Sequence, residues 1–261
     1  MLSNPVFQTF LRYKYLLMNL ISRDLKVKYR RSVLGIFWSL LNPILLMLVM
    51  SAVFSKIFHN DVEYFPLYLI IGQTVFSFFN EATSGALFSV VGASALIKKV
   101  YIPKYLFPLE KVMFAGVNFL FSLAAVLLMM IIYGVTFTWR IVLFVFPTLT
   151  LLMFAMGMGL LLAAACVFFR DVQHLYTVVL VAWTYLTPLF YPISYLEGHW
   201  IYSIVMLNPL THYVMYFRNV LIYAVVPTLT EHLICFGWGL LFLILGVVLF
   251  KKQQDKFILH I

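Results

Sequence analysis

Six long, mostly uncharged stretches dominate the pattern of hydrophobic and polar positions along the chain. They predict membrane-spanning helices at about 33–56, 64–90, 109–134, 141–169, 173–193 and 231–250. At a rise of about 1.5 Å per residue, a helix of some 20 residues crosses the ~30 Å hydrocarbon core of a bilayer. A membrane β-barrel would show strands of about ten residues with alternating polarity instead. The pattern therefore predicts an all-α integral membrane protein with six transmembrane helices.

The apolar region 197–226, between the fifth and sixth spans, has a different pattern. Gly198, Pro209, Arg218 and the following Pro227 interrupt it. One further span here would move the C-terminus to the other side, and the uninterrupted pieces are too short to cross separately. We expect a pair of re-entrant half-helices on the outer side, because such backbone is tolerated where it is buried in protein or lines a cavity. These half-helices would close a transport pathway, and an interfacial hairpin without a transport role is the alternative.

Residues 1–31 alternate basic and apolar positions and predict an amphipathic helix. Asn4 can cap this helix, and Pro5 suits its first turn. A basic amphipathic helix ahead of a span is expected to lie in the membrane interface, with its cations at anionic headgroups. Residues 32–261 then form a single six-helix transmembrane domain.

The composition indicates that lipid is the main solvent of this chain. Hydrophobic residues make up 64% and charged residues 10% of it, with a mean hydropathy of +1.01, whereas soluble domains carry about 25% charged residues. The net charge of +9 would suggest a nucleic-acid partner for a soluble protein, but here its distribution matters more. With six spans and a cytoplasmic N-terminus, fifteen of the eighteen Lys and Arg residues fall on the inner side. The positive-inside rule therefore predicts cytoplasmic termini, and no nucleic-acid partner is expected.

The sequence carries no motif for catalysis or for an energy source. The dipeptide Gly-Lys does not occur, so there is no phosphate-binding P-loop. The six histidines are scattered, and Cys166 and Cys235 lie far apart, so neither a metal site nor a disulfide framework is expected. We expect no cofactor on this chain, and a partner that supplies the energy for any uphill transport. A membrane-embedded lipid or sugar transferase is the alternative of another class, but it would need convergent polar groups.

The loop after the second predicted span is short and basic. Ser94 is expected to cap a helix that carries Lys98 and Lys99 and that Pro103 ends. Such a helix at the membrane surface suits docking onto a soluble partner, and a loop that only fixes topology is the alternative. Residues 169–172 form the matching inner loop after the fourth span.

Glu81 is the one acidic residue deep in a predicted span. A carboxylate that faces lipid costs roughly 2.5–3.5 kcal/mol on insertion scales, so Glu81 is expected to face protein, a partner subunit or water. A group in a pathway or dimer interface and a simple helix–helix hydrogen bond are both open. Aromatic side chains away from the span ends could stack on passing sugar rings, although packing in a belt or core is the ordinary interpretation. Examples are Phe76, Phe78, Phe79, Tyr185 and Phe190.

Several segments together resemble one family. The sequence RDLKVKYRRSVLGIFWSLLNP, residues 23–43, is similar to the N-terminal signature of the ABC-2 type permeases that export polysaccharides such as O-antigen, capsule and teichoic acid. Residues 98–104 resemble the first cytoplasmic coupling loop of that family, and residues 169–172 resemble the second. Residues 187–194 and 207–211 resemble its outer gate region. The resemblance covers essentially the whole chain.

The resemblance implies a permease homodimer that works with two copies of a separate nucleotide-binding ATPase, which carries the ATP and Mg²⁺. The residues implied in coupling to the ATPase are Ser94, Lys98, Lys99, Tyr101, Pro103, Lys104, Arg170 and Asp171. The translocation path would follow the dimer axis, with Phe76, Phe79, Glu81, Tyr185 and Phe190 as its candidate residues. The implied outer gate contains Tyr191, Pro192, Asn208, Pro209 and Arg218.

The hypothesis from the sequence is a permease subunit of an ATP-binding-cassette exporter. Its expected substrate is a lipid-linked polysaccharide, moved from the cytoplasm across a bacterial inner membrane, and the chain itself is not expected to be an enzyme. An ABC-2 permease for a small lipid or drug is the closer alternative. Those permeases often have large outer domains, whereas the outer loops here are short.

Overall fold

The computed structural model describes residues 5–58 and 62–260, and all regular secondary structure in them is helical. The predicted all-α fold class is confirmed. The cap assigned to Asn4 lies outside the described residues. The long helices are α1 (Pro5–Tyr29), α2 (Trp38–Phe58), α3 (Phe65–Leu87), α6 (Leu106–Ile132), α7 (Val145–Phe168), α8 (Val172–Leu186) and α11 (Leu229–Gln253). The short elements are η1 (Gly35–Phe37), α4 (Ser89–Gly92), α5 (Ser94–Ile97), η2 (Trp139–Phe144), η3 (Ile193–Leu196), α9 (Trp200–Leu207), α10 (Pro209–Leu221) and η4 (Gln254–Leu259).

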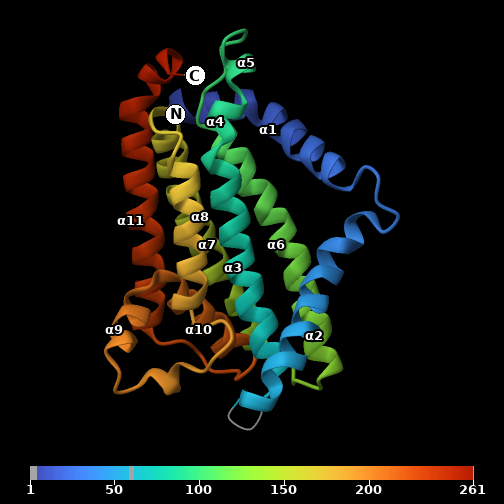
Figure 1. Ribbon diagram of the computed structural model, residues 1–261. Coiled ribbons are helices and arrows are strands. Elements are labelled where there is room, and N and C mark those ends of the chain that lie inside the picture. The colour runs from blue at the N-terminus through green and yellow to red at the C-terminus, as the bar shows by residue number, and fades with distance from the viewer. Residues whose placement is uncertain (1–4, 59–61, 261) are drawn as a thin grey trace.

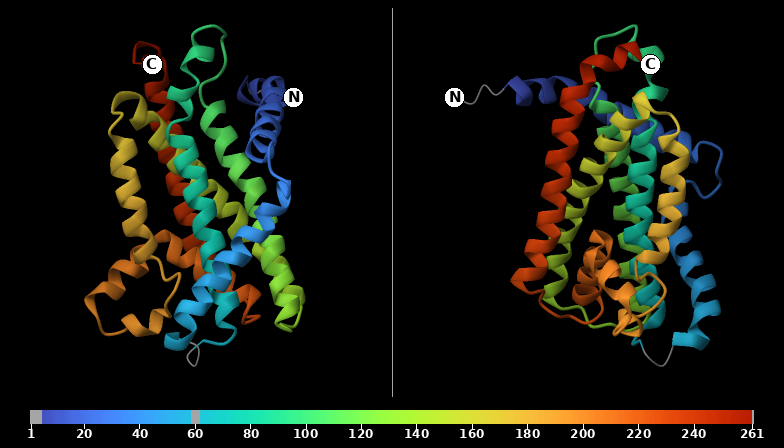
Figure 2. Two further views of the ribbon diagram at one scale, coloured as in Figure 1. Left: turned by 45° about the vertical axis from the view of Figure 1, so that its right-hand side comes forward. Right: turned by 60° about the vertical axis from the view of Figure 1, so that its left-hand side comes forward.

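The long helices other than α1 form a bundle with two distinct ends (Figure 1). At one end lie α1, α4, α5 and η4, and we call it the α1 end. At the opposite end lie α9 and α10, and we call it the α10 end. Figure 2 shows that α1 lies across the end of the bundle, crosswise to the long helices.

Among the residues that the structure describes, four helical segments are long and apolar enough to cross a bilayer, so the chain is a multi-pass membrane protein. They are Gly35–Lys56, Leu106–Ile132, Trp139–Phe168 and Leu229–Leu259, with mean hydropathies between 2.1 and 2.7. The helix expected at 173–193 is shorter than predicted, because α8 ends at Leu186. Thr187 is extended, with φ −102° and ψ 131°, as the residue before a proline prefers.

Glycines allow α7 and α11 to approach closely. A Cβ at Gly157 would lie 2.2 Å from the backbone of Phe242, and one at Gly246 would lie 2.3 Å from the carbonyl oxygen of Gly157. Small residues at membrane helix interfaces permit this backbone contact, in which packing rather than water exclusion drives association. The α7–α11 pair is therefore a rigid part of the bundle on which the shorter helices rest.

Most of α10 is buried inside the protein at the α10 end. Its large side chains Tyr213, Tyr216 and Phe217 are each at most 1% exposed. The Tyr213 hydroxyl donates its proton to the carbonyl of Cys235 at 2.7 Å and shares it with the carbonyl of Thr150 at 3.2 Å. Because these carbonyls belong to α7 and α11, α10 is anchored to the rigid helix pair.

Candidate functional site

The basic loop at the α1 end exposes three of the predicted coupling residues. Lys98 and Lys99 follow α5 and are exposed, and Tyr101 is 89% exposed. We call these three residues the coupling-loop surface. Arg170 and Asp171, in the loop before α8, are also exposed.

The predicted helix cap at Ser94 is wrong. Ala93 occupies the cap position, no side chain caps the helix, and α5 ends at Ile97, before Lys98 and well before Pro103. The physical reason is that α4 ends directly before Ala93, whose amide already bonds to the carbonyl of Ser89. The backbone thus enters α5 without a free helix start for a serine to cap.

The C-terminal element η4 holds the base of this loop. Phe257 is fully buried and belongs to the same apolar cluster as Ile97 and Ile102. Lys104 donates a hydrogen bond to the carbonyl of Gln254, and its ammonium lies 5.9 Å from the centre of the Phe257 ring. Lys104 therefore braces the loop from within, whereas the coupling-loop surface stays free for a partner.

The same element reaches the second inner loop. The ring of Phe168, the last residue of α7, lies 5.8 Å from the ring of Phe257 and 4.9 Å from that of His260. The end of α7, η4 and the base of the first loop therefore pack in one apolar cluster. The sequence analysis did not identify Phe257. The one indication in the sequence is that an apolar residue follows the basic end of α11.

At the α10 end, Arg218 is buried beneath the segment that follows α8. Its guanidinium donates four hydrogen bonds to three backbone carbonyls, those of Tyr68, Pro188 and Leu189, at 2.7 to 3.2 Å. Its central carbon lies 3.2 Å from the centre of the Tyr68 ring. Within the described part of the chain, none of these bonds goes to a carboxylate. Arg218 thus joins α10, α3 and the segment after α8.

Gly72 of α3 provides the space for Arg218. A Cβ there would lie 2.7 Å from a terminal nitrogen of the guanidinium. Tyr68 also donates a hydrogen bond, 2.9 Å long, to the carbonyl of Tyr191. Pro192 is buried beside it, so two of the predicted gate residues lie in the segment that Arg218 holds.

Asn208 makes a second junction at this end. Its side-chain oxygen accepts hydrogen bonds from the amide of Leu210 at 3.0 Å and from the indole of Trp183 at 2.7 Å. Its amide nitrogen donates to the carbonyl of Leu186 and the hydroxyl of Thr187, at 3.1 and 2.9 Å. Asn208 therefore caps α10 and fixes the C-terminal end of α8. Pro209 follows as the first residue of α10, where its missing N–H costs nothing.

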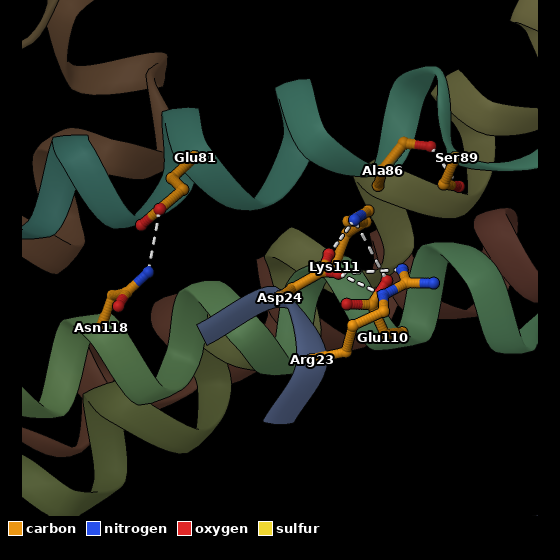
Figure 3. Close-up of polar contacts among 8 residues, drawn as sticks. All are labelled: Arg23, Asp24, Glu81, Ala86, Ser89, Glu110, Lys111 and Asn118. Atoms are coloured by element: carbon orange, nitrogen blue, oxygen red, sulfur yellow. Dashed lines mark hydrogen bonds and ion pairs between the residues drawn. The ribbon is translucent and has the colours of Figure 1, made fainter. Parts of the chain in front are cut away.

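Two ion pairs, one turn apart on α1, attach this helix to the bundle. Figure 3 shows the one between Asp24 and Lys111. Asp24 pairs with Lys111 of α6, which also lies 3.3 Å from the carboxylate of Glu110. Lys28 pairs with Glu81 of α3 at 2.8 Å. Burial raises the pKa of Asp24, but hydrogen bonds from Lys111 and Arg23 lower it, and the net pKa is below its usual value.

Glu81 also accepts a hydrogen bond from Asn118 of α6 at 2.9 Å, and so it faces protein as expected. Beside it lies a cavity of about 200 Å³ between α1, α2, α3 and α6, which we call the polar cavity. Its neutral polar lining comes from α2, α3 and α6, and includes Ser39, Asn42, Gln73, Ser77, Asn118 and Ser122. Sequence reasoning found Glu81 but missed Lys28 and Asn118 as its partners.

The predicted path residues are not brought together within one chain. Phe79 is fully buried and stacks on Phe154 with ring centres 4.9 Å apart, and Phe76 is 5% exposed. Phe190 stacks on Phe54, with ring centres 5.7 Å apart. Tyr185 is 68% exposed on α8, and none of these residues lines the polar cavity. In the described residues, no group of three His, Cys, Asp or Glu side chains could hold a metal ion.

Comparison with known proteins gives a consistent result. Residues 15–222 match the family described as ABC-2 type transporter. The O-antigen export system permease protein RfbA of Myxococcus xanthus is 34% identical over 76% of this chain and 77% of its own length. A protein of the same name from Klebsiella pneumoniae is 26% identical over 93% of both chains. The polysialic acid transport protein KpsM of Escherichia coli is 22% identical over 90% of this chain and 92% of its own.

Proposed function

Because the chain belongs to the ABC-2 type transporter family, we propose that it is the permease subunit of an ATP-binding-cassette exporter for a lipid-linked polysaccharide. The observation that carries this proposal is the similarity, along most of the chain, to permeases named for O-antigen export and polysialic acid transport. The substrate moves from the cytoplasm across the bacterial inner membrane, and the polymer is of the O-antigen, capsule or teichoic-acid type. The permease is not itself an enzyme.

Six helices span the membrane in this proposal: the four long apolar segments together with α3 and α8. The polar side chains of α3 support its assignment, because Glu81 and Gln73 face other helices rather than lipid. Helix α8 has 15 residues and reaches only about 22 Å. The segment held by Arg218 and Asn208 completes its crossing. The α1 end then faces the cytoplasm, as the positive-inside rule requires, and α1 lies in the interface.

In the working exporter, two copies of this chain assemble with two copies of an ATPase that binds ATP and Mg²⁺. The coupling-loop surface, with Arg170 and Asp171, contacts the ATPase. The exposure of the coupling-loop surface at the cytoplasmic end supports this role. Because η4 contacts both the base of this loop and the end of α7, a movement of the loop before α8 can displace the coupling-loop surface. The translocation path follows the axis between the two permease copies, and the exposed side chain of Tyr185 contacts the substrate there. Helices α9 and α10 enter the membrane from the outer side and close the path.

Charge reversal tests the docking role. Lys98→Glu together with Lys99→Glu is expected to abolish co-purification of the ATPase and export of the polymer. Lys252→Glu, an exposed change at the same end, is the matched control and should leave both intact. If the double variant still assembles and exports, the coupling-loop surface does not dock the ATPase.

Depletion of the chain tests the function as a whole. Cells that lose it are expected to accumulate finished polymer on its lipid carrier in the cytoplasm and to lose it from the surface. A small-molecule sensitivity with normal surface polymer would instead support a drug or small-lipid permease.

A further inference from the structure

The polar cavity is unusual for its position. It lies between α1 and the bundle helices α2, α3 and α6, where a membrane protein normally packs apolar side chains, yet hydroxyl and amide groups line it. Polar groups at membrane depth are costly and as a rule face a cavity with a function. We propose that the polar cavity binds one sugar ring of a lipid-linked saccharide. This inference rests on the proposed function and adds a loading site within each chain, apart from the path between the two copies.

Two buried oxygen atoms at the polar cavity point to a missing partner. Thr74 is 3% exposed and Asn118 is 5% exposed. Within the part of the chain that the structure describes, Oγ1 of Thr74 and Oδ1 of Asn118 have no hydrogen-bond partner. A buried polar group without a partner destabilises the free chain. Both residues line the polar cavity, and a sugar hydroxyl can donate to oxygens of this kind.

Charge distinguishes a sugar from a phosphate as the occupant. The one cation at the polar cavity, among the described residues, is Lys28, and its ammonium lies 2.8 Å from the carboxylate of Glu81. The cavity therefore has no net charge. A phosphate would need an uncompensated cation or several free N–H donors, whereas a neutral polyol needs only the hydroxyls and amides that are present.

Size and shape agree with a single ring. A volume of about 200 Å³ equals that of about six or seven water molecules at ~30 Å³ each, comparable to one sugar ring with its hydroxyls. Tyr29 and Trp38 line the wall where α1 gives way to α2, and aromatic faces offer apolar surface with a polar edge. The connection between α1 and α2 exposes the apolar side chains of Val33 and Phe37. In this proposal the lipid part of the ligand lies against these side chains.

Binding of a defined glycolipid tests the inference. The full chain is placed in nanodiscs of phosphatidylcholine, and retained lipids are counted by native mass spectrometry. The probe is monoglucosyl diacylglycerol, and diacylglycerol and phosphatidylglycerol are the competitors. One glycolipid per chain should be retained, and neither competitor should displace it. Displacement by phosphatidylglycerol, or no saturable binding, overturns the inference.

Two substitutions locate the site. Thr74→Val removes a hydroxyl and keeps the shape, so it should weaken glycolipid binding at least tenfold while leaving the free chain as stable or more so. Ser77→Leu fills the polar cavity and should abolish binding. Ser84→Ala, on the exposed face of the same helix, is the matched control. Equal binding by Thr74→Val and the native chain, or loss of binding in Ser84→Ala, would place the glycolipid elsewhere.

The depletion experiment described above tests the proposed function separately from the binding site. If the probe does not bind but depletion still traps polymer in the cytoplasm, only the loading site is wrong. If the probe binds and depletion leaves surface polymer unchanged, the polysaccharide assignment is wrong.

Discussion

Arg218 holds the α10 end together, and its replacement offers a quantitative test. Arg218→Met keeps most of the length and apolar stem of the side chain but removes all four hydrogen bonds to the carbonyls of Tyr68, Pro188 and Leu189. The carbonyls of Pro188 and Leu189 would then be left unpaired, whereas that of Tyr68 still accepts the hydrogen bond of its own helix, α3. At about 1–3 kcal/mol for each of these two carbonyls, the gross loss is about 2–6 kcal/mol. The guanidinium no longer has to be desolvated, which offsets part of this and leaves about 1–4 kcal/mol.

The assay is thermal unfolding of the full chain in one detergent. Since 1 kcal/mol shifts the midpoint by about 2–4 °C in a chain of this size class, Arg218→Met should melt roughly 2–16 °C lower. The melting midpoint of Arg218→Lys should lie between those of the native chain and Arg218→Met. Lysine keeps a positive charge, but its ammonium lacks the planar set of donors with which the guanidinium reaches three carbonyls. Arg170→Met, at an exposed position, is the control and should melt like the native chain.

A second readout reports the segment after α8 directly. Leu189 is fully buried, so a cysteine there should react slowly with maleimide in the native background and quickly beside Arg218→Met. If the Met variant melts within about 1 °C of native, or if the cysteine stays protected, Arg218 does not hold this segment and the reasoning is refuted.

Three further substitutions test other contacts. Gly157→Ala should destabilise the chain by about 1–3 kcal/mol or more, because its Cβ would meet the Phe242 backbone, while Gly237→Ala, with open space around it, should be neutral or stabilising in the same melt. Asp24→Asn should lower the midpoint at pH 7. The Asp24 pKa is held below its usual value, so the carboxylate stabilises the fold above about pH 4, and the difference should vanish as pH falls further. If the difference in midpoint between the native chain and Asp24→Asn grew as the pH fell, the ion pair would be contradicted. Thr228→Ala removes the capping box with Glu231 and should cost about 1 kcal/mol, whereas Thr230→Ala should cost little, and equal losses would show that the cap is not the cause.

The sequence predicted the long helices well because their signal is one-dimensional. Apolar runs and proline breaks locate α2, α6, α7 and α11 to within a few residues. The end of α8 was misplaced because the apolar run continues through Pro188 to Phe190, and hydropathy alone does not register the break.

The contacts between helices were not predictable in the same way. Arg218 was expected in the outer gate, but its contacts could not be foreseen, because the backbone carbonyls that converge on it are far apart in the sequence. Lys28 reaches Glu81 only because α1 folds across the bundle, and Asn118 reaches it because α6 packs against α3. Their partners are set by packing, which a single sequence does not display. Ser94 fits the local rule for a cap, but the preceding helix leaves no free start there.

The most direct test of the account is transport by purified components. The chain, together with its co-purified ATPase, is reconstituted into proteoliposomes that carry the lipid-linked polymer on their outer face. The account predicts that ATP and Mg²⁺ move the polymer inside, protected from added glycosidase, and that liposomes with the Lys98→Glu/Lys99→Glu permease leave it accessible. Polymer that stays accessible with the native chain, while the ATPase is bound and hydrolysing ATP, would contradict the assignment as a polysaccharide exporter.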